Sequence, residues 1–130
     1  MCGAKGAMND KLKTIRDKYS TCPEFFTVVI NDVNQRGNSG DTLLHVAAGR
    51  QAVEDIELLV ELGAQLDAVG DLGNTALHQA ASRGLVHSVK KLIELGAHSD
   101  IKNEFGQTPL NLAKLMERTE VIRLLTKRQR

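Results

Sequence analysis

The sequence predicts an all-α solenoid built from helix–turn–helix units, because two short segments recur along the chain with a common period. The first contains a threonine that returns at equal intervals, as Thr42, Thr75 and Thr108. The second ends in Gly-Ala and returns from Gly63 to Gly96, after the same interval. Two anchors that keep the same phase indicate one structural unit repeated in tandem. The composition agrees, since aromatic residues make up only 3% of the chain and small aliphatic side chains suit close helix packing.

The period divides the 130 residues into a tail, a cap and three repeats. The first seven residues show no periodicity and precede a second methionine, Met8, so we expect either a remnant of the expression vector or a disordered native tail. The segment before the first threonine lacks the repeated motif, as the atypical end of a repeat stack does. The predicted segments are the tail 1–7, the N-terminal helical cap 8–37, repeat one 38–70, repeat two 71–103, and repeat three with the C-terminal cap 104–130.

The N-terminal cap is predicted to be a pair of helices. Leu12, Ile15 and Tyr19 fall at i, i+3 and i+7 among charged residues, which is typical of an amphipathic helix with a narrow apolar side. Thr21 and Glu24 then form a capping-box pattern that starts a second helix. This second helix is apolar around much of its circumference, so we expect it to be buried on more than one side.

Each full repeat is predicted to hold two helices with recognisable ends. In repeat one the first helix runs from about residue 42 to 49 and the second from about 53 to 62. Gly63 and Gly96 stop the second helices, because the residue after a helix often adopts a left-handed conformation that suits glycine. The last helix, at about 120–127, lacks the Gly-Ala ending, and it is therefore predicted to be a C-terminal cap.

Each repeat begins with a threonine that we predict to be a helix N-cap, since its hydroxyl can accept a hydrogen bond from a main-chain N–H of the first turn. The third helical position carries a polar side chain that can reach back to the N-cap residue, as glutamate does in a capping box. The predicted capping residues are Thr42 with His45, Thr75 with His78, and Thr108 with Asn111.

From about Asn38 to the C-terminus, the Thr-x-Leu-His-x-Ala core and the period of 33 residues, from Thr42 to Thr75, resemble the ankyrin repeat. The resemblance implies stacked helix pairs whose connecting turns project as fingers, with the fingers and first helices on a concave side. We expect four departures from the family pattern to loosen the first repeats locally without changing the fold. Leu43 and Ala76 replace the usual proline, Gln51 replaces a glycine, and Gly70 replaces an acidic finger residue.

Ankyrin repeats typically bind other proteins on the concave side, so the resemblance implies a non-catalytic protein–protein interaction module. A narrower expectation is that the chain neutralises a toxin or inhibits an enzyme, as small stand-alone ankyrin proteins of bacteria often do. Leu72 and Phe105 share one finger position and are the candidate anchors, unless each side chain folds back over its own turn. Leu115 and Met116 belong either to this surface or to the core of the cap. The predicted partner-binding residues are Arg36, Ser39, Asp41, Arg50, Val69, Asp71, Leu72, Asn74, Arg83, Lys102, Glu104, Phe105 and Gln107.

The sequence carries no recognised catalytic or metal-binding motif. It contains no Gly-x-Ser-x-Gly, no phosphate-binding loop, no dinucleotide-binding fingerprint and no His-Glu-x-x-His. The four histidines lack cysteine or carboxylate co-ligands at a recognised spacing, so we predict a structural role for His45 and His78 rather than metal binding. We therefore expect no enzyme activity, no cofactor, no metal and no small-molecule substrate.

The compartment is predicted from features that the sequence lacks. No apolar run approaches the roughly 20 residues that a membrane crossing needs, and no signal-peptide pattern is present. Cys2 and Cys22 are too few for a disulfide framework, which favours a reducing environment. We therefore expect a cytoplasmic protein that does not bind membranes.

Charge is distributed unevenly, although the net charge is only +1. Residues 38–70 carry one arginine against six acidic residues, whereas residues 104–130 carry six basic and three acidic residues. This asymmetry either steers a basic partner or reflects an ordinary solvated helix surface. Together with apolar ends, it leaves a self-associating scaffold as the alternative function. Nucleic-acid binding through Lys127, Arg128 and Arg130 is the weaker alternative, because the chain is not strongly basic.

Overall fold

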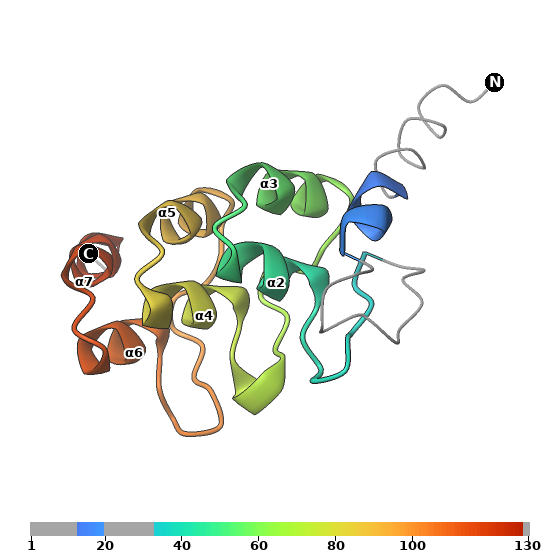
Figure 1. Cartoon of the computed structure of the whole chain (residues 1–130). Helices are drawn as coiled ribbons and strands as arrows, with labels where there is room; N and C mark the ends of the chain where they lie inside the picture. The colour runs from blue at the N-terminus through green and yellow to red at the C-terminus, as the bar shows by residue number, and fades with distance from the viewer. Residues whose placement is uncertain (1–12, 20–32, 129–130) are drawn as a thin grey trace.

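The computed structural model describes residues 13–19 and 33–128, which form a stack of helix pairs (Figure 1). Within these ranges the predicted all-α class is confirmed, and the pairing of extended backbone is limited to one isolated antiparallel bridge between Arg36 and Thr42. Residues 13–19 are helical. The other helices are α2 (Leu43–Gly49), α3 (Val53–Glu61), α4 (Ala76–Arg83), α5 (Val86–Glu94), α6 (Pro109–Leu115) and α7 (Thr119–Arg128), with a short 3-10 turn, η2 (Asp71–Gly73), before α4.

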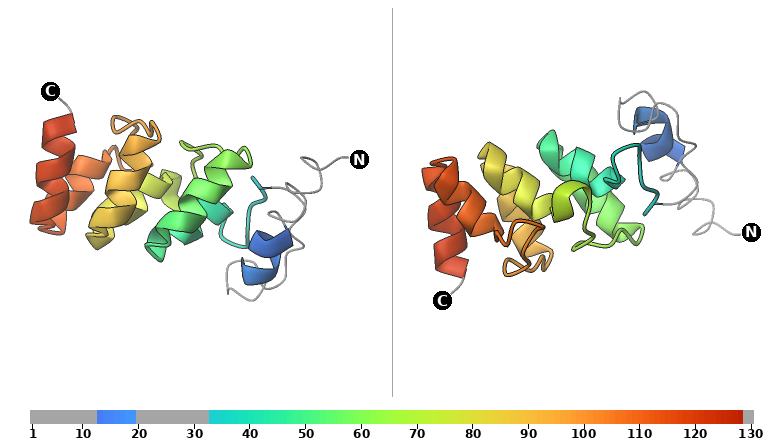
Figure 2. Two further views of the ribbon diagram at one scale, coloured as in Figure 1. Left: turned by 90° about the horizontal axis from the view of Figure 1, so that it is seen from above. Right: turned by 90° about the horizontal axis from the view of Figure 1, so that it is seen from below.

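The helices form two layers, and the finger loops extend from one edge of the stack (Figures 1 and 2). The first helices α2, α4 and α6 pack side by side in one layer, and the second helices α3, α5 and α7 pack in the other. Small side chains allow the first helices to approach closely, since Ala47, Ala48, Ala80 and Ala81 are all fully buried. The core between the layers is completed mainly by buried leucine, isoleucine and valine side chains.

The second helices of repeats one and two end as predicted, at a glycine in the left-handed region. Gly63 has φ +103° and Gly96 has φ +104°, values that a residue with a β-carbon rarely adopts. The residue after Gly96 is Ala97, which is buried in the core and whose N–H donates to the carbonyl of Leu92 at 2.9 Å. The Gly-Ala ending therefore turns the chain out of the helix and anchors the next loop in the core.

Residues 13–19 pack against repeat one through both apolar and polar contacts. Ile15 and Tyr19 are fully buried, as their predicted helical spacing requires. The Tyr19 hydroxyl donates to Oδ2 of the buried Asp55 at 2.7 Å, and Lys18 Nζ lies 2.7 Å from the same oxygen. The Asp55 carboxylate is thereby hydrogen-bonded and ion-paired, as a buried charge requires. Residues 1–7 and the predicted second capping helix after Thr21 lie outside the described residues.

The structure supplies physical reasons for two of the departures that we expected to loosen the first repeats. A β-carbon at Gly70 would lie 2.2 Å from Oδ1 of Asp41, so the carboxylate of Asp41 fills the space of the missing side chain. Gln51 has φ +56°, an uncommon value for a residue other than glycine, but its Oε1 accepts the His87 N–H of α5 at 3.0 Å. Gly70 therefore leaves room for the carboxylate of Asp41, and Gln51 makes a hydrogen bond between repeats.

Candidate protein-binding surface

The candidate surface consists of the finger loops and the first helices, and a hydrogen-bonded N-cap joins each finger to its helix. The Thr75 hydroxyl accepts the His78 N–H at 3.2 Å, and the Thr75 N–H donates to Nδ1 of His78 at 3.1 Å. Thr108 and Asn111 make the same reciprocal pair at 3.2 and 2.9 Å. These bonds satisfy main-chain donors at the start of each helix and fix the direction in which the finger leaves it.

The two histidines at this position also bind the following repeat, which the sequence reasoning missed. His45 Nε2 lies 2.9 Å from the carbonyl oxygen of Asn74, and His78 Nε2 lies 2.9 Å from that of Gln107. Because Nδ1 of each ring accepts a main-chain N–H, the proton of the neutral ring lies on Nε2, which donates to the carbonyl. The signal in the sequence was the difference at this position, since repeat three has the shorter Asn111 where repeats one and two have histidine.

The environment of His78 favours this neutral form. Burial lowers the pKa of His78 below its ordinary value of 6.5, hydrogen bonds with the carbonyls of Gln107 and Ile101 oppose the shift, and the nearby His45 lowers it further. A second proton on the ring would place an N–H at Nδ1 against the N–H of Thr75. The forward bond therefore depends on a neutral imidazole.

The carboxylate of Asp41 links the first finger to repeat two. Its Oδ1 accepts the Asp71 N–H at 2.9 Å, and its Oδ2 accepts from Nε2 of Gln79, on α4, at 3.0 Å. Gly70 leaves the space that this carboxylate occupies. Asp41 is predicted to contact a partner, and in the structure it also holds neighbouring repeats together; its partner Gln79 was not predicted.

The second and third fingers are joined by Asn103, which the sequence reasoning also missed. Its Oδ1 accepts the N–H groups of Phe105 and Gln107, both at 2.9 Å, and its Nδ2 donates to Oδ1 of Asn74 at 2.9 Å. Asn103 stands one period after Gly70, at the position expected to carry an acidic finger residue, and this equivalence could have identified it. Several predicted partner-binding residues thus make hydrogen bonds within the chain, among them Arg36, Asp41, Asn74, Arg83 and Gln107.

Large apolar side chains are exposed on the second and third fingers and at the end of α6. Phe105 is 67% exposed and Leu72 is 47% exposed, so neither is covered by its own turn. Leu115 and Met116 are 66% and 49% exposed, which places them at the surface rather than in the core of the cap. Val69 completes this set in the second finger. Exposed apolar groups of this size are candidates for direct contact with a partner.

The backbone of Leu72 has an unfavourable conformation for its residue type. Its φ of 58° and ψ of 21° lie in the left-handed region, where leucine is rare and where glycine, asparagine or aspartate is the usual occupant. The carbonyl of Leu72 accepts the N–H of Glu104 at 3.0 Å, which joins its finger to the finger that carries Phe105. The fold thus places an apolar side chain at a strained, exposed position next to a second one.

The charged members of the predicted set are also exposed. In the fingers these are Asp71, Lys102 and Glu104, and the polar Ser39 is exposed in the first finger. Arg83, at the end of α4, donates from Nη1 to the carbonyl of Gly49, the last residue of α2, at 3.3 Å. The guanidinium of Arg50, at the end of α2, lies 5.2 Å from the ring centre of Tyr19. Both arginines therefore have structural contacts as well as exposed surface.

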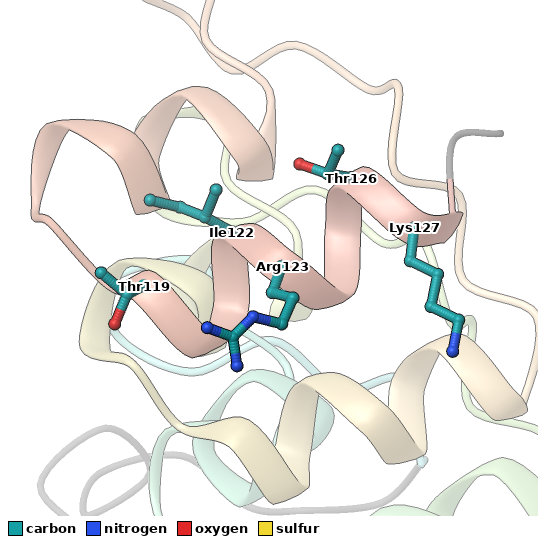
Figure 3. Close-up of a pocket in the computed structure, with 5 residues that line it drawn as sticks. All are labelled: Thr119, Ile122, Arg123, Thr126 and Lys127. Carbon is teal, nitrogen blue, oxygen red and sulfur yellow. The ribbon is translucent and has the colours of Figure 1, made fainter.

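The outer side of α7 has a shallow hollow of about 520 Å³ (Figure 3). Its lining comes from Thr119, Ile122, Arg123, Thr126 and Lys127. Thr126 stands one period after Ile93 and Thr119 stands one period after Val86, so two aliphatic positions of the interior repeat are hydroxylated here. The residues that line the hollow include no converging set of acid, base or metal-ligating groups, and the two hydroxyl groups make this side of α7 more polar than the equivalent side of α5.

Residues 13–19 and 33–128 hold neither a cluster of metal-ligating side chains nor a helix suited to crossing a membrane. No group of three histidine, cysteine, aspartate or glutamate side chains in this part of the chain could hold a metal ion. No helix in the same ranges has both the length and the apolar character for crossing a membrane.

The fold and its surface define a helical-repeat protein with projecting fingers. The family model for ankyrin repeats in three copies matches residues 15–103 and, in a second overlapping match, residues 66–130. The chain therefore belongs to the ankyrin-repeat family. Ankyrin repeats are general protein–protein interaction modules, and the family is typically non-catalytic. No curated protein matches the chain.

Proposed function

We propose that this chain binds a partner protein through the finger surface, which we define as the three finger loops and the exposed ends of α2, α4 and α6. Leu72 and Phe105 are its anchors. The observation that carries the proposal is the combination of strain and exposure at Leu72. Its left-handed backbone costs conformational energy, and its half-exposed side chain contributes little packing energy to offset this cost. Such local costs are typical of positions retained for binding.

The polar groups around these anchors support a rigid site. Asp41 and Asn103 hold each finger to its neighbour, and Arg36 Nη1 donates to the carbonyls of Gly40 and Val69, both at 2.6 Å. Fingers that are already ordered lose less conformational entropy when a partner binds. The same bonds explain why polar residues of the predicted set contribute to the shape of the surface, whereas the exposed apolar residues remain for direct contact.

A site-specific cross-link tests this proposal. Phe105 is replaced by the photoreactive amino acid p-benzoylphenylalanine, and the same replacement at Glu57 on α3, away from the fingers, is the control. We expect a covalent adduct with one protein partner from the native source at position 105 and none at position 57. Adducts at position 57 alone would place the binding surface on the second helices and contradict the proposal.

The narrower form of the proposal is that the partner is a toxin or another enzyme. Once the cross-linked partner is identified, its activity is measured at increasing concentrations of this chain. A loss of activity that Leu72→Ala and Phe105→Ala both relieve supports inhibition through the finger surface. An unchanged activity at saturating concentrations leaves a binding role without inhibition.

Self-association is supported less well than partner binding, because the last repeat is polar where another repeat would stack. Asn111 is exposed and replaces His78 of the interior repeat, and Lys114 is exposed and replaces the fully buried Ala81. A second copy stacked on this end would have to bury these groups without partners. We therefore expect a single monomeric species in sedimentation-velocity runs up to about 100 µM, a concentration at which even weak dimers with a Kd in the micromolar range form.

A further inference from the structure

Where α3 and α5 pack side by side, a lysine is held between two carboxylates. Lys91 Nζ lies 3.0 Å from Oε2 of Glu57 on α3 and 3.0 Å from Oε1 of Glu94 on its own helix. The hydrogen bond with Glu57, and then that with Glu94, raises the pKa of Lys91. This arrangement shows how the side chains on neighbouring second helices can converge on one charged group.

One repeat further along the stack, the groove between α5 and α7 has the opposite charges at the equivalent positions. Lys90 stands one period after Glu57, and Lys127 stands one period after Glu94. The position of the central Lys91 is taken by Leu124. The α5–α7 groove thus has two ammonium groups at the places of the two carboxylates, and an apolar side chain at the place of the charge between them.

This groove is a real depression with an apolar base. Its volume is about 240 Å³, and it is lined by Lys90, Ile93, Glu94, Leu124 and Lys127. Ile93 and Leu124 are half-buried and pack against the core. In Figure 3 the Lys127 side chain extends from the last turn of α7, away from Ile122 and Thr126.

The two lysines of the groove lack an acidic partner among the residues that the structure describes. Lys90 and Lys127 are exposed, and neither forms an ion pair within residues 13–19 and 33–128. Glu94, the one carboxylate in the lining, is bonded to Lys91. The groove is therefore apolar at its base and positively charged at its edges, which is complementary to an acidic, apolar ligand.

We propose that the α5–α7 groove docks a segment of a partner protein that presents a carboxylate next to an apolar side chain. The apolar side chain lies on Ile93 and Leu124, and the carboxylate lies between Lys90 and Lys127. This contact is the charge-reversed counterpart of Lys91 between Glu57 and Glu94. The groove belongs to the layer of second helices, so the contact is separate from the finger surface.

A first experiment asks whether the two lysines can hold a carboxylate. Leu124→Glu places one at the position equivalent to Lys91, and its pKa is measured by NMR. We expect a pKa below the ordinary glutamate value of about 4.3, which returns to that value when Lys90→Gln and Lys127→Gln are added. An unshifted pKa in the folded Leu124→Glu variant would overturn the proposed geometry.

A second experiment uses the wild-type groove and therefore does not depend on the folding of Leu124→Glu. A displayed library of random 12-residue peptides is selected on protein that carries Leu72→Ala and Phe105→Ala, so that ligands of those two anchors are disfavoured. A counter-selection uses the same protein with Lys90→Gln and Lys127→Gln. The matched control carries Lys13→Gln and Arg16→Gln, two cationic residues on the helix of residues 13–19, outside both surfaces.

We expect the selected peptides to carry aspartate or glutamate within four positions of leucine, isoleucine, valine or phenylalanine. Their affinity should fall at least tenfold with Lys90→Gln and Lys127→Gln and should not change with the control substitutions. Failure to enrich such peptides over the counter-selection, or enrichment of basic peptides, would overturn the proposal. Either result leaves the proposal for the finger surface unchanged, because the cross-linking test of that proposal uses a different part of the molecule.

Discussion

The imidazole of His78 joins two repeats through its two ring nitrogens, since Nδ1 accepts the N–H of Thr75 at 3.1 Å and Nε2 donates to the carbonyl of Gln107 at 2.9 Å. The two bonds act on different parts of the chain. The first completes the cap of α4, and the second holds the third finger, 29 residues further along. Substitutions that remove one bond and keep the other can therefore separate helix capping from coupling between repeats.

His78→Asn is expected to keep the cap, as Asn111 does in repeat three, and to lose the bond to Gln107. The carbonyl of Gln107 loses one of its two donors and keeps the Asn103 N–H at 2.9 Å. The free energy of unfolding should therefore fall by about 0.5–1.5 kcal/mol, the net value of one hydrogen bond. Urea unfolding of the variant measures the loss. His87→Asn, at an exposed histidine, is the control and should change stability by less than about 0.5 kcal/mol. Equal losses in the two variants would contradict a special role for the forward bond.

Stability should decrease as the pH falls below about 6.5, the ordinary histidine value. Because the pKa of folded His78 is lowered, the unfolded chain binds a proton first, and the stabilising effect of the neutral ring is complete only above 6.5. For one proton the slope is at most about 1.4 kcal/mol per pH unit. Urea unfolding between pH 5 and 8 should show a smaller slope for His78→Asn than for wild type. Identical slopes would show that His78 does not contribute.

Thr75→Ala should lower the free energy of unfolding by about 1 kcal/mol, because the His78 N–H loses its acceptor. The loss should exceed that of Thr108→Ala, since Thr75 is fully buried between two repeats and Thr108 is only half-buried in the last one. Denaturant melts of both variants provide the comparison. A larger loss at Thr108 would mean that the terminal repeat, rather than the central one, limits stability.

Leu72→Asn is expected to raise stability and weaken binding at the same time. Asparagine tolerates the left-handed conformation better than leucine, so a gain of about 0.5–1 kcal/mol is expected in the free energy of unfolding. Loss of the apolar anchor should weaken affinity for the partner at least tenfold, which corresponds to about 1.4 kcal/mol. Phe105→Asn is the matched control, because Phe105 has no positive φ and should gain no stability. Thermal melts and calorimetric titrations separate the two effects.

Gly70→Ala should destabilise the junction of repeats one and two, because the new β-carbon would lie 2.2 Å from Oδ1 of Asp41 and 3.0 Å from Nε2 of His45. A loss of about 1–3 kcal/mol is typical of such overpacking. Asp41→Ala in the same chain should recover part of it, since the closest atom is then absent. A double-mutant cycle from urea melts measures the coupling, and additive losses would show that the contact is not what excludes a side chain here.

The helices could be predicted closely because their signals are local in the sequence. The second helix of repeat one was predicted at about 53–62 and is observed at Val53–Glu61. The last helix was predicted at about 120–127 and is observed at Thr119–Arg128. A threonine before an apolar turn and a glycine after the last one act within a few residues of the helix end. Such boundaries need no knowledge of the packing.

The bonds between repeats could be predicted much less well. The forward reach of His78, the Asp41 link to Gln79 and the Asn103 link to Asn74 all connect residues 29–38 positions apart. The two residues of each bond become neighbours only when the helix pairs stack. The identity of one side chain and its sequence neighbours does not indicate which distant residue will be its partner. Comparing residues one period apart recovers part of the information, as the charge reversal from Glu57 to Lys90 illustrates.

The one-way direction of the histidine bonds has a mechanical consequence. His45 is hydrogen-bonded to the second finger and His78 to the third, but Asn111 makes no equivalent bond to a later segment among the described residues. Among the described residues, repeat two is thus joined by two such bonds, from His45 and to Gln107, whereas repeat three is joined by one. Under a pulling force we expect the third repeat to detach from the second before the second detaches from the first.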